Sequence, residues 1–124
     1  MQIKVLKSKL HRGTVTSAKV QYPGSIGIDP DLLEAAGIVP YECVLVADLE
    51  NGNRLETYAI EAGRGTGAIE ILGAAARLIH AGDRVIVMAF GLMSPEQARS
   101  LKPKVVVLGQ GNRILSAPET EPKD

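Results

Sequence analysis

The stretch 21–29, QYPGSIGID, is one of the few places in this chain where residue types and spacing point to chemistry. Tyr22-Pro23-Gly24-Ser25 has the composition of a tight turn, because proline presets φ at the first corner and glycine accepts a positive φ at the second. The same order sets a serine hydroxyl beside an unhindered glycine carbonyl. We expect a turn at Pro23-Gly24. The turn signal by itself does not decide whether Ser25 is a reactive residue.

A second set of reactive side chains lies in the segment 54–60, RLETYAI, which is typical of a β-strand. A period of two places Arg54 and Tyr58 on one face of this strand and Thr57 on the other. The guanidinium of Arg54 offers a planar fork for a carboxylate, and the phenol of Tyr58 is a candidate acid.

Other common chemistries find little support in the sequence. His11 and His80 are the two histidines, and no carboxylates cluster near them at metal-ligand spacing, so we expect no metal site. Cys43 lies inside an apolar run and is predicted to be a buried, inert thiol. The glycine-rich loop 63–67 lacks the Lys-Ser/Thr ending of a phosphate-binding loop. Neither a nucleophile elbow nor a dinucleotide-binding fingerprint is found.

Composition narrows the class of protein. The 124 residues fit one domain, and 45% of them are hydrophobic but only 3% aromatic, so the core must be aliphatic and each tyrosine is a candidate for another role. The formal charge is zero, with 14 basic and 14 acidic residues, which argues against nucleic acid as a partner and permits self-association. Without a signal peptide or a membrane-length apolar run, we expect no membrane contact and a cytoplasmic location.

These residues must be positioned by short elements. A helix is expected from Asp29-Pro30 to a stop at Gly37, and a second one from the capping box Ser94-Pro95-Glu96-Gln97 to about Leu101. Asn51-Gly52 predicts a hairpin. Strands are expected at 2–7, 13–20, 43–49, 54–60, 68–72, 84–90 and 104–108. So many short strands favour a small closed β-barrel.

Two further segments carry simple expectations. The small residues at 73–76 indicate either the start of a helix or a place where another group approaches the backbone closely. The segment 116–124 is polar and rich in proline, and it is predicted to be a mobile tail.

Seven stretches in register make the chain resemble the pyruvoyl-dependent aspartate 1-decarboxylase family from residue 1 to about residue 110. They are Lys9-Leu10-His11-Arg12, Tyr22-x-Gly24-Ser25 followed by Ile28-Asp29, Asn51-Gly52-x-Arg54, Thr57-Tyr58-Ala59-Ile60, Arg64-Gly65, Gly73-Ala74-Ala75-Ala76 and Gly82-Asp83.

The resemblance implies a mainly β fold, a six-stranded double-psi β-barrel with short helices, formed by residues 1–115. It implies a precursor that cuts itself between Gly24 and Ser25, leaving chain 1–24 and a larger chain whose body is 25–115. Family members are homotetramers with active sites between adjacent subunits, and some relatives need an accessory protein to mature.

The implied activity is that of a carboxy-lyase, converting L-aspartate to β-alanine and carbon dioxide for pantothenate and coenzyme A synthesis. The implied cofactor is a covalent pyruvoyl group made from Ser25, which forms a Schiff base with the substrate amine; neither a metal nor pyridoxal phosphate is implied. The Ser25 hydroxyl attacks the Gly24 carbonyl, elimination of the resulting ester releases chain 1–24, and hydrolysis with loss of ammonia leaves the pyruvoyl end.

The resemblance also assigns roles to residues. Tyr58 returns a proton after carbon dioxide leaves, and Thr57 holds the oxyanion during self-cleavage and contacts substrate. Substrate binding is assigned to Lys9, Arg54, Gly73, Ala74 and Ala75. The residues that line the site with less defined roles are His11, Tyr22 and Ile86.

The chain departs from the family pattern at two positions. Leu72 stands where the family usually has Asn, and Arg77 stands where His is often found. Because an amide is missing, we expect self-cleavage to be slow or to use another group. The alternative function is an unprocessed barrel that acts as a binding or regulatory oligomer.

Overall fold

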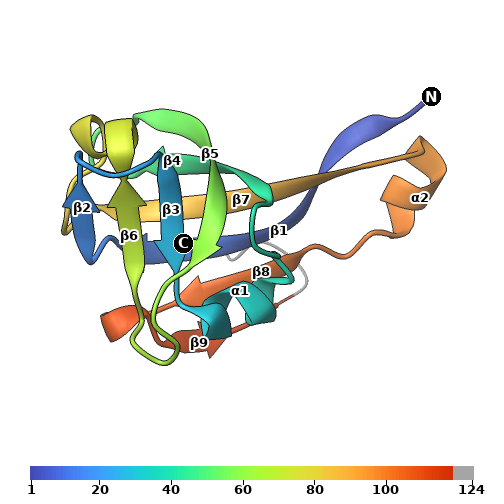
Figure 1. The fold of residues 1–124 in the computed structure, drawn as a ribbon. Coiled ribbons are helices and arrows are strands. Elements are labelled where there is room, and N and C mark those ends of the chain that lie inside the picture. The colour runs from blue at the N-terminus through green and yellow to red at the C-terminus, as the bar shows by residue number, and fades with distance from the viewer. Residues whose placement is uncertain (119–124) are drawn as a thin grey trace.

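The computed structural model describes residues 1–118, and strands dominate it (Figure 1). Two short α-helices, α1 (Pro30–Ala36) and α2 (Pro95–Ser100), and two 3-10 helices, η1 (Gly73–Arg77) and η2 (Gln110–Asn112), connect them. The strands are β1 (Ile3–Thr14), β2 (Ser17–Lys19), β3 (Ser25–Ile28), β4 (Cys43–Asp48), β5 (Arg54–Glu61), β6 (Ile69–Leu72), β7 (Arg84–Met93), β8 (Lys104–Leu108) and β9 (Ile114–Ser116).

The predicted mainly β class with short helices is confirmed, and residues 1–118 form nine strands in place of the expected six. Short pairing segments raise the count, since β2 and β9 have three residues each. All nine strands join one sheet in the order β2-β6-β3-β5-β4-β7-β1-β8-β9. Three pairs, β1–β8, β2–β6 and β3–β5, are parallel, and the other pairs are antiparallel.

The core is aliphatic, as the composition requires. In Figure 1, strands β2, β6, β3 and β5 run across β7 and β1, which lie behind them. Fully buried side chains from seven strands, β1 and β3 to β8, meet in the core, among them Leu10, Ile26, Val46, Val87 and Val106. Burial of this apolar surface is the main stabilising term for such a fold.

The predicted Asn51-Gly52 turn and the predicted helix caps are confirmed. Asn51-Gly52 connects β4 to its antiparallel partner β5. The Asp29 side chain caps α1, and Gly37 ends it in the left-handed conformation with φ 68°. Ser94 and Gln97 form the reciprocal capping box of α2.

In the N-terminal part of the chain, the structure differs from three predictions about strands and turns. Strand β1 is continuous to Thr14, with an irregularity between Leu10 and Gly13, where Arg12 has φ 64°. The stretch after Gly24 is a strand, β3, which the sequence did not predict because all four of its residues are buried and show no alternation. Gly24 itself does not have the positive φ expected of the turn; residues 20–22 and Gly24 form bends.

Near the C-terminus, β9 pairs with β8, and Ser116, the first residue of the predicted tail, is its last residue. Residues 119–124 lie outside the described residues, so the mobility of the tail stays a prediction. Within residues 1–118, no helix has the length and apolar character that a membrane crossing demands.

Candidate active site

Ser25 is the first residue of β3 and is almost completely buried, with 3% of its surface exposed. Antiparallel pairing places it opposite Leu72, the last residue of β6. On its other side, β3 pairs in parallel with β5, so that Ile26 lies beside Ala59. The serine is thus fixed between two strands that come from much later in the chain.

Gly73 lies directly against Gly24, and only Gly73 is held to glycine by its surroundings. Gly73 has φ +85°, and a Cβ on it would lie 2.6 Å from Gly24 Cα and 2.8 Å from the Tyr22 carbonyl oxygen. A Cβ on Gly24 would meet no atom within 4 Å. The backbone at the predicted cleavage point is therefore supported on one side and open on the other, as an attack on its carbonyl requires.

The open side of Gly24 faces a cavity of about 470 Å³. Five residues predicted for the site line it: Gly24, Thr57, Tyr58, Ala74 and Ala75. The other lining residues are Leu55, Glu56 and Leu78. Because residues 55–58 all border the cavity, it extends along β5, and this is how Thr57 and Tyr58 reach one space from opposite faces of the strand.

Arg54 and Ile86 do not line this cavity. They share the outer face of the sheet, because Arg54 pairs with Ala47 and Ala47 pairs with Ile86 across β5, β4 and β7. Lys9 belongs to the same face, since it pairs with Met88 of β7. One chain therefore does not bring these residues to Gly24.

The remaining predicted residues also lie apart from the cavity lining. His11 is buried on β1, paired with Val107 of β8. The Tyr22 ring is exposed, with Lys19 Nζ 5.4 Å from its centroid, while the Tyr22 carbonyl approaches Gly73.

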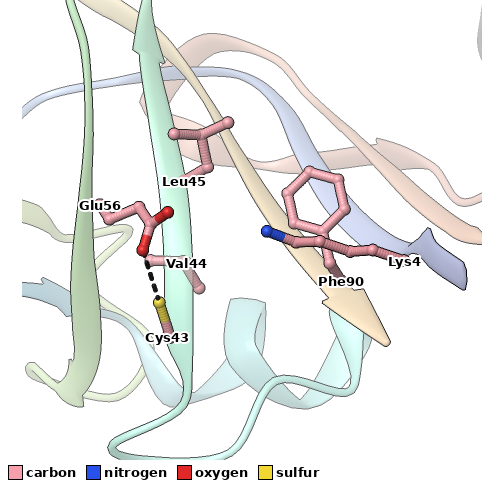
Figure 2. Close-up of a pocket in the computed structure, with 6 residues that line it drawn as sticks. All are labelled: Lys4, Cys43, Val44, Leu45, Glu56 and Phe90. Atoms are coloured by element: carbon pink, nitrogen blue, oxygen red, sulfur yellow. Dashed lines mark hydrogen bonds between the residues drawn. The ribbon is translucent and has the colours of Figure 1, made fainter. Parts of the chain in front are cut away.

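A second cavity, of about 380 Å³, opens on the outer face of β4 and is lined by Lys4, Cys43, Val44, Leu45, Glu56 and Phe90 (Figure 2). Cys43 is exposed there, which corrects the prediction of a buried thiol: it projects outward beside the buried Val44. Burial raises the pKa of the Cys43 thiol, and so does the hydrogen bond it donates to Glu56 Oε2 at 3.6 Å. A thiol with a raised pKa is a poor nucleophile at neutral pH, so the predicted inertness agrees with this environment.

Asp29, directly after β3, secures the strand end. Its carboxylate accepts hydrogen bonds from the backbone N–H groups of Asp31, Gly65 and Gly67 at 2.8–3.0 Å. Burial by itself would raise the pKa of Asp29, but these three bonds outweigh it and hold the pKa below its ordinary value. The glycine-rich loop 63–67 thus binds a carboxylate of its own chain.

Three lining residues, Leu55, Glu56 and Leu78, were not predicted from the sequence. The one available signal was that Leu55 and Glu56 directly precede Thr57 in the chain. It also missed Tyr41, whose ring centroid lies 6.2 Å from that of Tyr58. The available signal for Tyr41 was the scarcity of aromatic residues, which makes each tyrosine a candidate for a role outside the core. In the described part of the chain, no group of three or more His, Cys, Asp and Glu side chains is arranged to hold a metal ion.

Comparison with known proteins gives concordant matches. A family model described as "Aspartate decarboxylase" matches residues 1–115. An aspartate 1-decarboxylase of Phenylobacterium zucineum is 51% identical, with 94% of this chain and 99% of that protein covered. A protein of the same name from Acetivibrio thermocellus is 49% identical, with 98% of this chain and 96% of that protein covered. Another from Ralstonia pickettii is 48% identical, with 97% of this chain and 100% of that protein covered. Among solved structures, the rationally designed mkDPBB_sym1 protein has a TM-score of 0.46 at 18% identity, covering 70% of this chain and 96% of that one.

Proposed function

The chain belongs to the aspartate decarboxylase family, and from that premise we propose that it is a carboxy-lyase that converts L-aspartate to β-alanine and carbon dioxide. The β-alanine would serve pantothenate and coenzyme A synthesis. The observation that carries the proposal is the cavity in which Gly24, Thr57 and Tyr58 meet the small residues Ala74 and Ala75.

Self-cleavage at Gly24-Ser25 fits the surroundings of these residues. The Ser25 Oγ adds to the Gly24 carbonyl carbon, the Gly24–Ser25 C–N bond breaks, and the acyl group passes from nitrogen to oxygen as an ester. The Thr57 hydroxyl, which shares the cavity with Gly24, donates a hydrogen bond to the oxyanion of this step. Elimination then releases the carboxylate of chain 1–24, and loss of ammonia to water leaves a pyruvoyl end.

The pyruvoyl group supplies a ketone that binds the substrate amine and draws off the electrons left when carbon dioxide departs. The Tyr58 phenol, on the rim of the cavity, donates the proton that replaces the lost carboxyl group. Gly73, Ala74 and Ala75 offer backbone without bulk, which lets a small dicarboxylate approach closely.

We propose that Arg54, Lys9, His11 and Ile86 complete the site from a neighbouring protomer of a homotetramer. Arg54 and Lys9 are cations suited to the two carboxylates of aspartate. Two observations support an assembly: these residues lie away from the cavity of their own chain, and the outer face beside them carries half-buried apolar side chains such as Leu45 and Met88.

The single thiol of the chain fits action in a reducing cytoplasm. An accessory maturation protein is a further candidate partner, because Leu72 leaves Ser25 without an amide opposite it.

Intact-mass analysis of the purified protein tests the proposal. We expect two species, chain 1–24 and a chain beginning at residue 25 that is lighter by one ammonia than the corresponding serine-ended peptide. The cleaved protein should release carbon dioxide from L-aspartate.

The matched control is Ser25→Ala, which should remain one chain and show no activity. A single full-length mass after prolonged incubation, without decarboxylation, would contradict the proposal and favour the unprocessed barrel. Decarboxylation by Ser25→Ala would contradict the role of the serine.

A further inference from the structure

Tyr41 occupies a backbone position that its side chain disfavours. Residues 39–42 form a turn in which Glu42 N donates to Val39 O at 3.1 Å, Pro40 is the second residue, and Tyr41 is the third, with φ +72°. This is the pattern of a type II turn, whose third position favours glycine or asparagine. A bulky side chain in the left-handed region is an outlier that calls for a physical reason.

Burial is not that reason, because 78% of the Tyr41 surface is exposed. The ring instead lies over Tyr58, with the centroids 6.2 Å apart and the planes tilted by 31°. This separation is within the range of favourable aromatic pairs. Tyr58 is itself 37% exposed, and within this chain the Tyr41 ring supplies a contact that restrains it.

The turn is attached firmly to the strand that carries Tyr58. Tyr41 N donates to Ala59 O at 2.7 Å, and Ala59 N donates to Glu42 O at 3.0 Å, so both hydrogen bonds engage the residue next to Tyr58. Glu42 is also held from β1 by Lys7, whose Nζ lies 2.6 Å from Glu42 Oε2. The turn therefore presents the Tyr41 ring at a fixed place relative to β5.

We propose that Tyr41 is a positioning residue for Tyr58, holding its phenol at the cavity in the orientation needed for proton transfer. This inference rests on the proposed function, in which Tyr58 is the proton donor. Tyr41 acts through the ring contact alone, and the unfavourable backbone is retained because glycine or asparagine would lack the ring.

Two substitutions at position 41 separate the ring from the backbone. Tyr41→Asn suits the left-handed turn but removes the ring, and Tyr41→Phe keeps the ring. Each variant is first shown by intact mass to be cleaved, and its thermal midpoint is recorded. Borohydride trapping of L-aspartate on the protein then reports substrate capture, and β-alanine formation reports kcat and KM.

For Tyr41→Asn we expect a thermal midpoint equal to or above that of the wild type, normal trapping of L-aspartate and an unchanged KM. Its kcat should be lower by about tenfold, which is less than the full rate contribution of a general acid. Tyr41→Phe should keep kcat within about twofold of the wild type. In a Tyr58→Phe background, adding Tyr41→Asn should cause no further loss, since the two residues act as one unit.

If Tyr41→Asn has the kcat of the wild type while Tyr58→Phe is impaired, the positioning role of Tyr41 is overturned and the proposed function stands. Equal losses in Tyr41→Phe and Tyr41→Asn would overturn the ring contact as its basis. Full activity of Tyr58→Phe would remove Tyr58 as proton donor, and this inference would fall with it.

Discussion

Leu72 lies opposite Ser25, at the position where an amide is expected from the family pattern. We predict that Leu72→Asn increases the rate of self-cleavage by about tenfold, because an amide N–H adds a donor near the oxyanion formed at Gly24. The measurement is a time course of intact mass after rapid purification of the precursor. Leu72→Ala, which removes bulk without adding a donor, is the control, and equal rates for the two variants would contradict the prediction.

The candidate site residues were easier to name from the sequence than to place in space. The Gly24-Ser25, Thr57 and Tyr58 positions stand in recognisable stretches, and the structure gathers Gly24, Thr57 and Tyr58 at one cavity with Ser25 behind it. Tyr41 could not be assigned, because its contact with Tyr58 depends on a turn whose third residue would ordinarily be glycine or asparagine.

The junction between β6 and η1 supports the predicted cleavage point through Gly73, which contacts Gly24. We predict that Gly73→Ala lowers the free energy of unfolding by about 2 kcal/mol more than Gly82→Ala, because a Cβ at Gly73 collides with the backbone of Gly24 while one at Gly82 meets nothing within 4 Å. Both glycines have similar φ values, +85° and +90°, so the control carries the same backbone strain of about 1–2 kcal/mol.

Urea unfolding of both variants in a Ser25→Ala background measures this difference without cleavage. In the background that keeps Ser25, Gly73→Ala should also cleave more slowly than Gly82→Ala. Equal stability of the two variants would show that the contact with Gly24 does not constrain the junction.

Elements with local signals were predictable, and elements defined by distant partners were not. Both α-helices follow from caps within their own sequence, and the β4–β5 hairpin follows from Asn51-Gly52. Strand β3 has four buried residues and exists because β5 and β6 pair with it from far along the chain. The close contact at 73–76 was one of two stated alternatives, and both occur: η1 begins where Gly73 contacts Gly24.

Across the whole domain, the carboxyl groups of Asp48 and Asp83 couple stability to pH. Asp48 is buried, and no donor among the described residues reaches its Oδ2. Burial and the hydrogen bond with Asp83 raise the pKa of Asp48, whereas that bond and the His80 N–H lower the pKa of Asp83. A proton retained on Asp48 and donated to Asp83 explains both directions.

The sign of this coupling follows from linkage. Above the ordinary pKa of 3.8 an unfolded Asp48 loses its proton while the folded one keeps it, so stability from Asp48 falls as pH rises towards its raised pKa. Asp83 contributes in the opposite sense, and its stabilisation is lost as pH falls below its ordinary value.

Asp48→Asn should therefore be more stable than its parent at pH 8, by about 1 kcal/mol, because the amide is a donor at every pH, whereas keeping the acid protonated costs more as the pH rises. The advantage should shrink as the pH falls towards the ordinary pKa of 3.8, because a growing share of Asp48 then keeps its proton. Thermal midpoints in a Ser25→Ala background give the measurement. A variant that is less stable than its parent at pH 8 would rule out the shared proton.

The place of β1 in the sheet changes what cutting the chain would mean. Chain 1–24 carries β1 and β2, and β1 is an interior strand of the sheet, paired with β7 on one side and β8 on the other. A cut at Gly24-Ser25 would therefore leave two polypeptides in one sheet, with the smaller one held on both sides by strands of the larger. Once parted, two such pieces would have to find each other by diffusion, whereas the uncut precursor holds the whole fold on one connected chain.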